Sequence, residues 1–290
     1  MAELLDYLIR LLRRMTHVFV PYGTSPEKYR RLMQAMHKQL VYDPQTQTVT
    51  VKKGKLAGAK KYGPFCDADF DFALGRYETE VTAAFDRYCR PGMTVFDVGA
   101  HAGHHTILLS KLCGVSGHVH AFEPVPQNVE CLRETLRLNN LQNVSVHELA
   151  VSDREGEARL KCNGVFDGFA CLAEGGHGRT EFSTTASTVL TVRTIDVDTF
   201  CNKFGIARID LIKMDIEGAE MLALRGMTRT LRRRRPVLIL ELWGCEHIAE
   251  APGFLGGLGY ETRTLSTWQG YIQGAFAETS NVLALPISVT

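Results

Sequence analysis

An apolar strand that runs directly into a glycine turn is the feature that most constrains the fold of this chain. The segment Val95-Phe96-Asp97-Val98-Gly99-Ala100-His101-Ala102-Gly103 has the apolar residues of a buried strand, followed by two glycines and a helical pattern. Gly99 permits a tight turn, and Gly103 permits the next helix to approach a ligand closely. A helix N-terminus also presents free backbone N–H groups. The segment therefore predicts a strand, a turn and a helix around a bound cofactor.

Two acidic residues on neighbouring strands narrow the choice of cofactor. A dinucleotide site requires G-x-G-x-x-G after the strand, whereas the spacing here is D-x-G-x-x-x-G. Asp97 is suited to pair with the ammonium group of S-adenosylmethionine. Glu123 ends the next strand, where an acid accepts hydrogen bonds from ribose hydroxyls. The end of the third strand, Ala150-Val151-Ser152-Asp153, is then expected beside the adenine.

Strands and helices alternate along the chain from residue 77 onward. Alternation of this kind indicates a doubly wound, mostly parallel α/β sheet. Two late strands, near residues 261–265 and 281–285, predict a hairpin at the edge of the sheet. Apolar runs predict the preceding strands at residues 94–98, 119–122, 144–151, 210–216 and 237–242.

The beginning of the chain and one internal segment depart from this alternation. Residues 1–60 are interpreted as an N-terminal accessory region of helices and a short strand, and residues 61–290 as the main domain. Residues 157–194 have strand-like ends and a Gly-rich middle, which predict a flap insertion. An amphipathic helix in residues 1–15 is expected to pack on the domain or to form a homo-oligomer, and a membrane-surface helix is the alternative.

Composition narrows the range of partners. The 290 residues carry a formal net charge of +1, which gives no overall field for binding nucleic acid. No run approaches the roughly 20 apolar residues of a transmembrane segment. The 8 cysteines lack a C-x-x-C pair, so a cytoplasmic protein with reduced thiols is expected. The basic run at residues 232–235 is interpreted as a solvated helix end, with nucleic acid or phosphate binding as the alternative.

Six motifs between Tyr77 and Glu241 belong together: Tyr77-Glu78, Asp97-Val98-Gly99-Ala100, Glu123-Pro124, Ala150-Val151-Ser152-Asp153, Ile209-Asp210-Leu211-Ile212-Lys213-Met214-Asp215-Ile216-Glu217-Gly218-Ala219-Glu220 and Leu240-Glu241. In these motifs the chain resembles the FkbM family of class I methyltransferases. The resemblance implies a Rossmann-like sheet of seven strands and methyl transfer from S-adenosylmethionine. The residues and the resemblance together predict a cofactor site of Glu78, Asp97, Gly99, Ala100, His101, Gly103, Glu123, Pro124, Ala150, Ser152, Asp153 and Asp215.

Three histidines depart from the pattern of that family. Its members tend to have Asn in place of His101 and an aromatic residue near His104 or His105. His101 is able to supply the hydrogen bonds of that Asn. A metal site built from the three histidines is the less favoured alternative.

Charged residues at the ends of two later strands are the candidates for catalysis. Alternation places Lys213, Asp215 and Glu217 on one side of the extended segment, at the edge where ligands of doubly wound sheets bind. Asp215 is the first candidate for orienting or deprotonating an acceptor hydroxyl, and Glu241 is the second. A buried Lys–Asp pair is the structural alternative. A divalent metal held by Asp215 and Glu241 is a further open alternative.

The sequence therefore predicts an S-adenosylmethionine-dependent O-methyltransferase that releases S-adenosylhomocysteine. The expected reaction is direct in-line methyl transfer to a hydroxyl of a small-molecule natural product or glycan. An NAD-dependent oxidoreductase on a Rossmann-like domain and a non-catalytic cofactor-binding module are the two alternatives. The sequence does not name the acceptor, because the least interpretable segments are those expected to bind it.

Overall fold

The structure, a computed structural model, describes residues 37–66, 68–162, 171–172, 188–272 and 275–287. The chain divides into two units, Met1–Tyr77 and Glu78–Thr290. This boundary lies later in the chain than residue 60, where the sequence places the start of the main domain. The helix expected in residues 1–15 lies outside the described residues.

The first unit contains a three-stranded antiparallel sheet and a short helix: β1 (Tyr42–Asp43), β2 (Thr48–Thr50), β3 (Lys60–Tyr62) and α3 (Ala68–Ala73). The short strand of the accessory region is therefore present as β2. Lys61 Nζ lies 2.9 Å from Asp69 Oδ2, and both side chains are buried. Because a buried charge requires a partner, this ion pair joins β3 to α3.

The second unit is organised around a sheet of seven strands, in the spatial order β13 (Tyr260–Ile272), β14 (Ala275–Pro286), β12 (Val237–Trp243), β11 (Leu211–Met214), β4 (Thr94–Val98), β5 (His118–Phe122) and β6 (Val144–His147). Strand β14 is antiparallel to both of its neighbours, and the other strands run in one direction. The predicted seven-stranded, mostly parallel sheet and its edge hairpin are confirmed.

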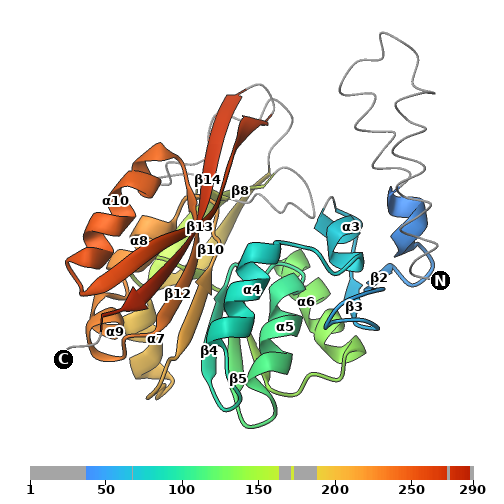
Figure 1. The fold of residues 1–290 in the computed structure, drawn as a ribbon, viewed down its shortest axis with the longest axis horizontal. Coiled ribbons are helices and arrows are strands. Elements are labelled where there is room, and N and C mark those ends of the chain that lie inside the picture. The colour runs from blue at the N-terminus through green and yellow to red at the C-terminus, as the bar shows by residue number, and fades with distance from the viewer. Residues whose placement is uncertain (1–36, 67, 163–170, 173–187, 273–274, 288–290) are drawn as a thin grey trace. The chain divides into compact units, whose positions relative to one another are not determined.

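Helices cover both faces of this sheet (Figure 1). One face carries α4 (Thr79–Tyr88), α5 (His104–Cys113) and α6 (Pro126–Leu138), and the other carries α7 (Val197–Lys203), α8 (Glu220–Arg225), α9 (Thr228–Arg233) and α10 (Cys245–Gly256). None of the helices in the described part of the chain has the length and hydropathy that a bilayer crossing requires.

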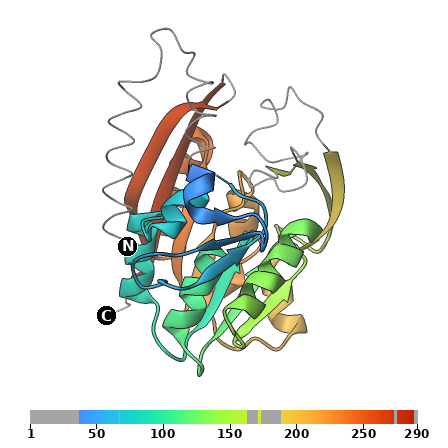
Figure 2. The same cartoon turned by 90° about the vertical axis from the view of Figure 1, so that its right-hand side faces the viewer.

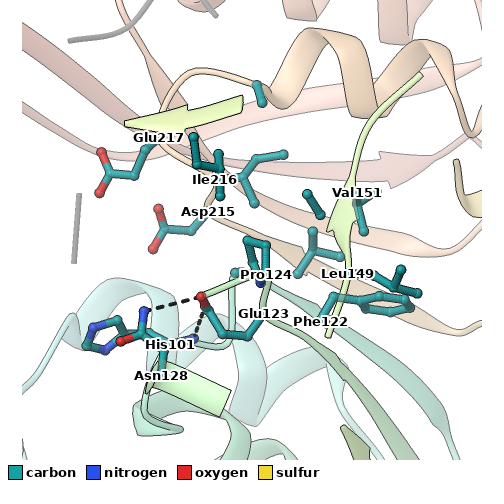
Figure 3. Close-up of a pocket in the computed structure, with 15 residues that line it drawn as sticks. His101, Phe122, Glu123, Pro124, Asn128, Leu149, Val151, Asp215, Ile216 and Glu217 are labelled. Atoms are coloured by element: carbon teal, nitrogen blue, oxygen red, sulfur yellow. Dashed lines mark hydrogen bonds between the residues drawn. The ribbon is translucent and has the colours of Figure 1, made fainter. Parts of the chain in front are cut away.

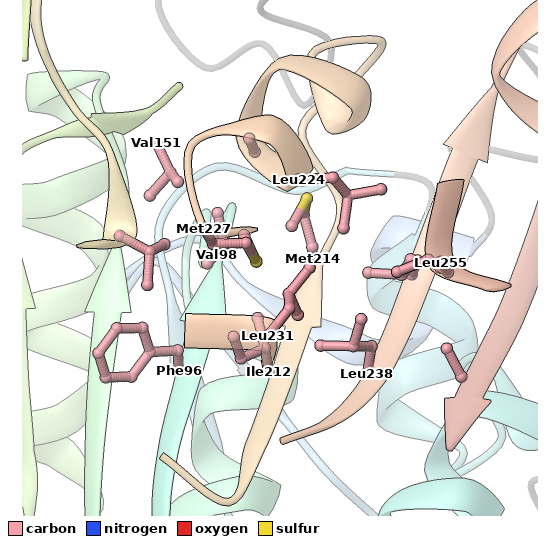
Figure 4. Packing of buried hydrophobic residues seen from close by; sticks show 14 of the residues in the cluster. Phe96, Val98, Val151, Ile212, Met214, Leu224, Met227, Leu231, Leu238 and Leu255 are labelled. Carbon is pink, nitrogen blue, oxygen red and sulfur yellow. The ribbon is translucent and has the colours of Figure 1, made fainter. Parts of the chain in front are cut away.

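The largest apolar core lies on the face covered by α7 to α10. Ile212 and Leu238 from the central strands pack in one cluster with Leu224, Leu231 and Leu255 from the helices (Figure 4). Both faces of a parallel sheet are covered, so its strands read as continuous apolar runs. This is why the sequence located β4, β11 and β12.

Several strands differ from their predicted bounds, and the hairpin strands β13 and β14 are much longer than the residues 261–265 and 281–285 predicted for them. Residues 144–151 form two strands, because β6 ends at His147 and β7 (Ala150–Val151) pairs with a strand of another sheet. The backbone turns between them, where the Leu149 N–H donates to the His147 carbonyl oxygen at 2.9 Å. The strand predicted at residues 210–216 already ends at Met214, and the following helix begins at Glu220.

A second sheet is built from the strand-like ends of the predicted flap. Strand β8 (Gly156–Cys162) pairs antiparallel with β10 (Thr188–Ile195), flanked by β7 and β9 (Cys171–Leu172). Figure 2 shows this pair in yellow-green and the β13–β14 hairpin in red on opposite sides of the view. Most of the Gly-rich middle lies outside the described residues, so its role as a flap stays a prediction.

Three histidines gather on one face of the main sheet, among aromatic side chains. His120 Nδ1 lies 3.1 Å from His147 Nε2, and His118 Nε2 lies 2.8 Å from Ser145 Oγ. The ring of Phe200 packs edge-on against His120 and His147. Burial lowers the pKa of His120 and the pKa of His147 to about 4. Both rings are therefore neutral near pH 7.

We expect thermal stability to fall as the pH is lowered from 6.5 toward 4. In that range an unfolded histidine, with a pKa of about 6.5, binds a proton that the folded His120 and His147 do not, so acid favours unfolding. In His147→Gln, which cannot take up the proton, the dependence of the melting temperature on pH should become shallower. His118→Gln should change this pH dependence less, because the His118 ring is less buried than the His147 ring. An unchanged slope in His147→Gln would contradict the assignment.

Candidate functional site

A pocket of about 680 Å³ opens at the carboxyl ends of β4, β5 and β11 (Figure 3). Ligands of doubly wound sheets bind at this edge. Six predicted site residues line the pocket, namely Gly99, His101, Glu123, Pro124, Ala150 and Asp215. The pocket therefore lies where the sequence places the site.

The remaining predicted residues surround the pocket without lining it. Ala100 and Ser152 are buried next to lining residues, and Asp153 follows Ser152 away from the lining. Glu78, Asp97, Lys213 and Glu241 belong to a charged group next to Asp215. The structure thus separates the predicted residues into those that a ligand in the pocket would contact and those that support them.

Gly99 brings the ends of β4 and β11 together. Its φ of 78° is in the left-handed region, and a Cβ at this position would lie 1.8 Å from the Asp215 carbonyl oxygen. The Asp215 N–H donates to the Val98 carbonyl oxygen at 3.0 Å. Only glycine has both the conformational freedom and the space for this approach.

Gly103 permits a close approach between two helices. A Cβ at Gly103 would lie 2.9 Å from Leu132 Cδ1 and 3.3 Å from Thr135 Cγ2, both on α6. The predicted approach of this glycine to a ligand stays a prediction. Gly103 supports the site through helix packing.

Glu123 is buried at the end of β5 and already accepts three hydrogen bonds. The donors are the His101 N–H at 2.9 Å, the Val125 N–H at 3.0 Å and Asn128 Nδ2 at 3.2 Å. Burial raises the pKa of Glu123 above its ordinary value, although these donors oppose the shift. A carboxylate has about four acceptor positions, so capacity for a further donor remains on the pocket side.

Asn128 is a pocket residue that the sequence analysis did not identify. It is 2% exposed, and its Nδ2 donates to Glu123. Within the part of the chain that the structure describes, its Oδ1 has no hydrogen-bond partner. A buried acceptor that lacks a donor destabilises the folded state, so this site would favour a ligand that carries a hydrogen-bond donor. The only signal in the sequence was its place in the first turn of the helix that follows Glu123.

The two ends of the pocket differ in polarity. Figure 3 shows Phe122, Leu149 and Val151 on one side and the carboxylates of Asp215 and Glu217 on the other. Glu217 has a φ of 54°, so the turn after β11, rather than strand alternation, places it beside Asp215. A ligand with an apolar ring at one end and polar groups at the other would match this division.

Lys213 is a buried cation beneath the pocket. Its Nζ lies 3.6 Å from Asp97 Oδ1 and 3.6 Å from Asp215 Oδ2, and it donates to the Gly99 carbonyl oxygen at 3.0 Å. Burial alone would lower the pKa of Lys213, but Asp215 and Asp97 raise it above its ordinary value. Asp97 is 0% exposed and also accepts from Thr106 Oγ1 at 2.6 Å. The buried Lys–Asp pair, the structural alternative above, is therefore present.

Four carboxylates crowd the polar end. Burial, together with the charges of Asp215, Glu78 and Glu217, raises the pKa of Glu241 well above its ordinary value. Glu78 precedes α4 in a left-handed conformation, and its Oε2 lies 3.5 Å from His105 Nε2. Burial lowers the pKa of His105 to about 3, so this ring is neutral. A proton is therefore retained at Glu241 at higher pH than at an ordinary glutamate.

The three histidines at the start of α5 and in the turn before it do not form a ligand group. The His101 ring stacks on that of His104, with centroids 6.1 Å apart, whereas His105 packs edge-on against Phe85. Among the described residues, His101, His104 and His105 do not bring three ligand atoms within 4.8 Å of one another. His101 instead donates its backbone N–H to Glu123.

Comparisons with known proteins agree with this geometry. The family model of the methyltransferase FkbM domain matches residues 97–261, more than half of the 290 residues. The chain is 26% identical over 145 residues to the hexuronic acid methyltransferase AglP of Haloferax volcanii, across 50% of this chain and 54% of that protein. It is 26% identical over 153 residues to the 2-O-methyltransferase NoeI of Sinorhizobium fredii, across 50% of this chain and 62% of that protein.

The chain thus spans less than two thirds of the length of these two relatives. Among solved structures, the methyltransferase FkbM from Methylobacillus flagellatus aligns with a TM-score of 0.43 and 14% identity, over 88% of this chain and 60% of that chain.

Gly99→Ala tests the close approach of β4 and β11. The added Cβ would meet the Asp215 carbonyl oxygen, so we expect the free energy of unfolding to fall by about 2–4 kcal/mol. Gly205→Ala is the matched control, because Gly205 also has a positive φ but a Cβ there meets nothing within 4 Å. It should lose about 1 kcal/mol. Equal losses in urea denaturation would show that the contact at Gly99 is relieved by movement of the backbone.

Proposed function

The chain belongs to the FkbM family of S-adenosylmethionine-dependent methyltransferases, and on that premise we propose that it methylates a hydroxyl oxygen of a sugar or other small natural product. The observation that carries the proposal is one pocket with an apolar wall, two buried acceptors at Glu123 and Asn128, and carboxylates at Asp215 and Glu217. Two relatives, a hexuronic acid methyltransferase and a 2-O-methyltransferase, support an oxygen acceptor.

The residues of the pocket fit the cofactor. Glu123 and the partnerless Oδ1 of Asn128 provide acceptors for the two ribose hydroxyls. Phe122, Leu149 and Val151 offer an apolar surface for the adenine ring. The carboxylates at the opposite end suit an ammonium group. The bound cofactor supplies a methyl group that its positively charged sulfur has already activated.

The protein's contribution is then alignment and proton transfer. We assign Asp215, which lines the pocket, the role of orienting the acceptor hydroxyl. Glu241, whose pKa is raised by burial and by the charges of the neighbouring carboxylates, is the proposed base, acting directly or through Asp215. Lys213 is a positioning residue, because it holds Asp215 and the Gly99 turn without lining the pocket. General base catalysis of this kind contributes about 10²–10⁴-fold.

S-adenosylhomocysteine should bind with one-to-one stoichiometry in isothermal titration calorimetry. Glu123→Gln and Asn128→Ala should each weaken binding by roughly tenfold or more, since each removes hydrogen bonds to a buried hydroxyl. Glu130→Gln, an exposed glutamate on the same helix as Asn128, is the control and should bind like the unaltered protein. Removing the ribose 2′- or 3′-hydroxyl from the ligand should weaken its binding to the unaltered protein. The same removal should weaken binding to Asn128→Ala less, because that variant already lacks the acceptor. Binding of NAD alone would overturn the proposal in favour of an oxidoreductase.

Glu241→Gln should raise the melting temperature at pH 8 by a few degrees and leave it nearly unchanged at pH 4. The raised pKa means that folded Glu241 keeps a proton which the unfolded chain has lost, so the folded state is disfavoured as the pH rises above about 4.5. The amide removes this penalty. Glu261→Gln, on the exposed edge strand, is the control. If the melting temperature of Glu241→Gln shows no pH-dependent gain over the unaltered protein, Glu241 does not have the raised pKa on which its assignment as the general base rests.

A further inference from the structure

A second hollow, of about 300 Å³, lies at the amino edge of the main sheet, opposite the edge that carries the cofactor pocket. Asn202, Arg229, Thr230, Arg233 and Arg234 line it. All five come from α7, α9 and the residue after α9. Each of these helices leads into a parallel strand, β11 or β12, so the chain here approaches the amino edge of the sheet (Figure 1). The cofactor pocket lies at the opposite, carboxyl edge.

The hollow is lined by hydrogen-bond donors. Three guanidinium groups and the Asn202 amide surround it. Arg234 is held in place by Thr230 Oγ1 at 3.2 Å and by the Ile206 carbonyl oxygen at 2.6 Å. Arg229 donates to the Asp198 carbonyl oxygen at 3.2 Å. These partners are uncharged oxygens, so they position the guanidinium groups without neutralising them.

Three basic residues on neighbouring segments are paired with carboxylates, whereas among the described residues Arg235, in the same basic run, donates only to carbonyl oxygens. Lys203 pairs with Glu155, Arg208 with Asp210, and Arg225 with Glu250. The Asp198 carboxylate instead accepts the backbone N–H groups of Arg229 and Thr230 at 2.9 and 2.7 Å.

Counting described residues only, no carboxylate lies within 4.0 Å of the guanidinium groups of Arg229, Arg233 or Arg234.

A solvated helix end explains part of this arrangement of arginines but not all of it. Cations in the last turn of a helix are favourable, which accounts for Arg232 and Arg233. Arg229 is in the first turn of the same helix, where a cation is unfavourable, and it stands four residues before Arg233, where like charges repel. An anion between these groups would remove both penalties.

We propose that the hollow binds a phosphate-type oxyanion. Arginine is suited to this because its planar fork donates two parallel hydrogen bonds to a phosphate group. The phosphate of a soluble ester and that of a lipid headgroup share this chemistry. Phe204, which follows α7 and is 58% exposed, gives the same edge an apolar side chain that a lipid surface would contact.

The test uses two variants of neighbouring arginines. Arg233→Gln removes a lining charge, whereas Arg232→Gln removes an equal charge that does not line the hollow, and both side chains are exposed. Inorganic pyrophosphate is titrated into the full chain in phosphate-free buffer. We expect saturable binding that weakens roughly tenfold in Arg233→Gln, as one charge-assisted hydrogen-bond pair is lost, and less than about twofold in Arg232→Gln.

A second arm distinguishes the sources of phosphate. Vesicles of phosphatidylglycerol, compared with vesicles of phosphatidylcholine, are sedimented with the same three proteins. Binding to the anionic vesicles that Arg233→Gln reduces and Arg232→Gln does not would assign the site to a lipid phosphate, and pyrophosphate binding alone would assign it to a soluble ester. Binding of neither probe, or equal losses in the two variants, would overturn the proposal. S-adenosylhomocysteine binding should be unchanged in both variants.

Discussion

The buried ammonium group of Lys213 is the interaction on which the rest of the site depends. An isolated cation in the interior is prohibitively costly, so Lys213 requires Asp97 and Asp215 beside it. Its hydrogen bond to the Gly99 carbonyl oxygen then fixes the turn that shapes the floor of the pocket. Removal of one partner from a buried pair costs about 3–5 kcal/mol, because the other charge is left uncompensated. The chemistry of the pocket and the stability of the sheet therefore share the same residues.

Much of the fold could be predicted because its central strands are covered on both faces. The run Thr94–Val98 is apolar and ends at a glycine turn, and β4 has the same bounds. The break between β6 and β7 could not be predicted. The turn at Leu149 is made by a backbone hydrogen bond to His147, in a stretch with no glycine or proline to mark it. The β-branched residues on either side are equally suited to one long strand or two short ones.

The candidate site could be located from the sequence but not resolved into roles. Glycine turns and strand-end acids mark the carboxyl edge of a sheet, which is why Glu123 and Asp215 were found. Asp97 is different, because its role is set by pairing across strands. It stands directly beside Lys213 in the register of β4 and β11. The two residues are far apart in the chain, and a single sequence contains no sign of their register. Asn128 was missed for a different reason: it is close to Glu123 in the chain, but its side chain meets that carboxylate only because of the way the chain turns from β5 into α6.

The small net charge of the chain conceals a separation of charge along the strand direction. In a doubly wound sheet the helices that connect parallel strands run opposite to the strands, so their positive N-terminal ends face the carboxyl edge. Glu78 precedes α4 and Glu123 precedes α6 at that edge. Basic residues occupy the last turns instead, as Arg87, Lys111, Arg137, Lys203 and Arg233. Where such residues occur, the helix ends thereby stabilise acids at one edge and bases at the other. A net charge of +1 is therefore compatible with a carboxylate-rich pocket and an arginine-lined hollow in one domain. The net charge gives only the sum of the charges, whereas the fold places acids and bases at opposite edges of the sheet.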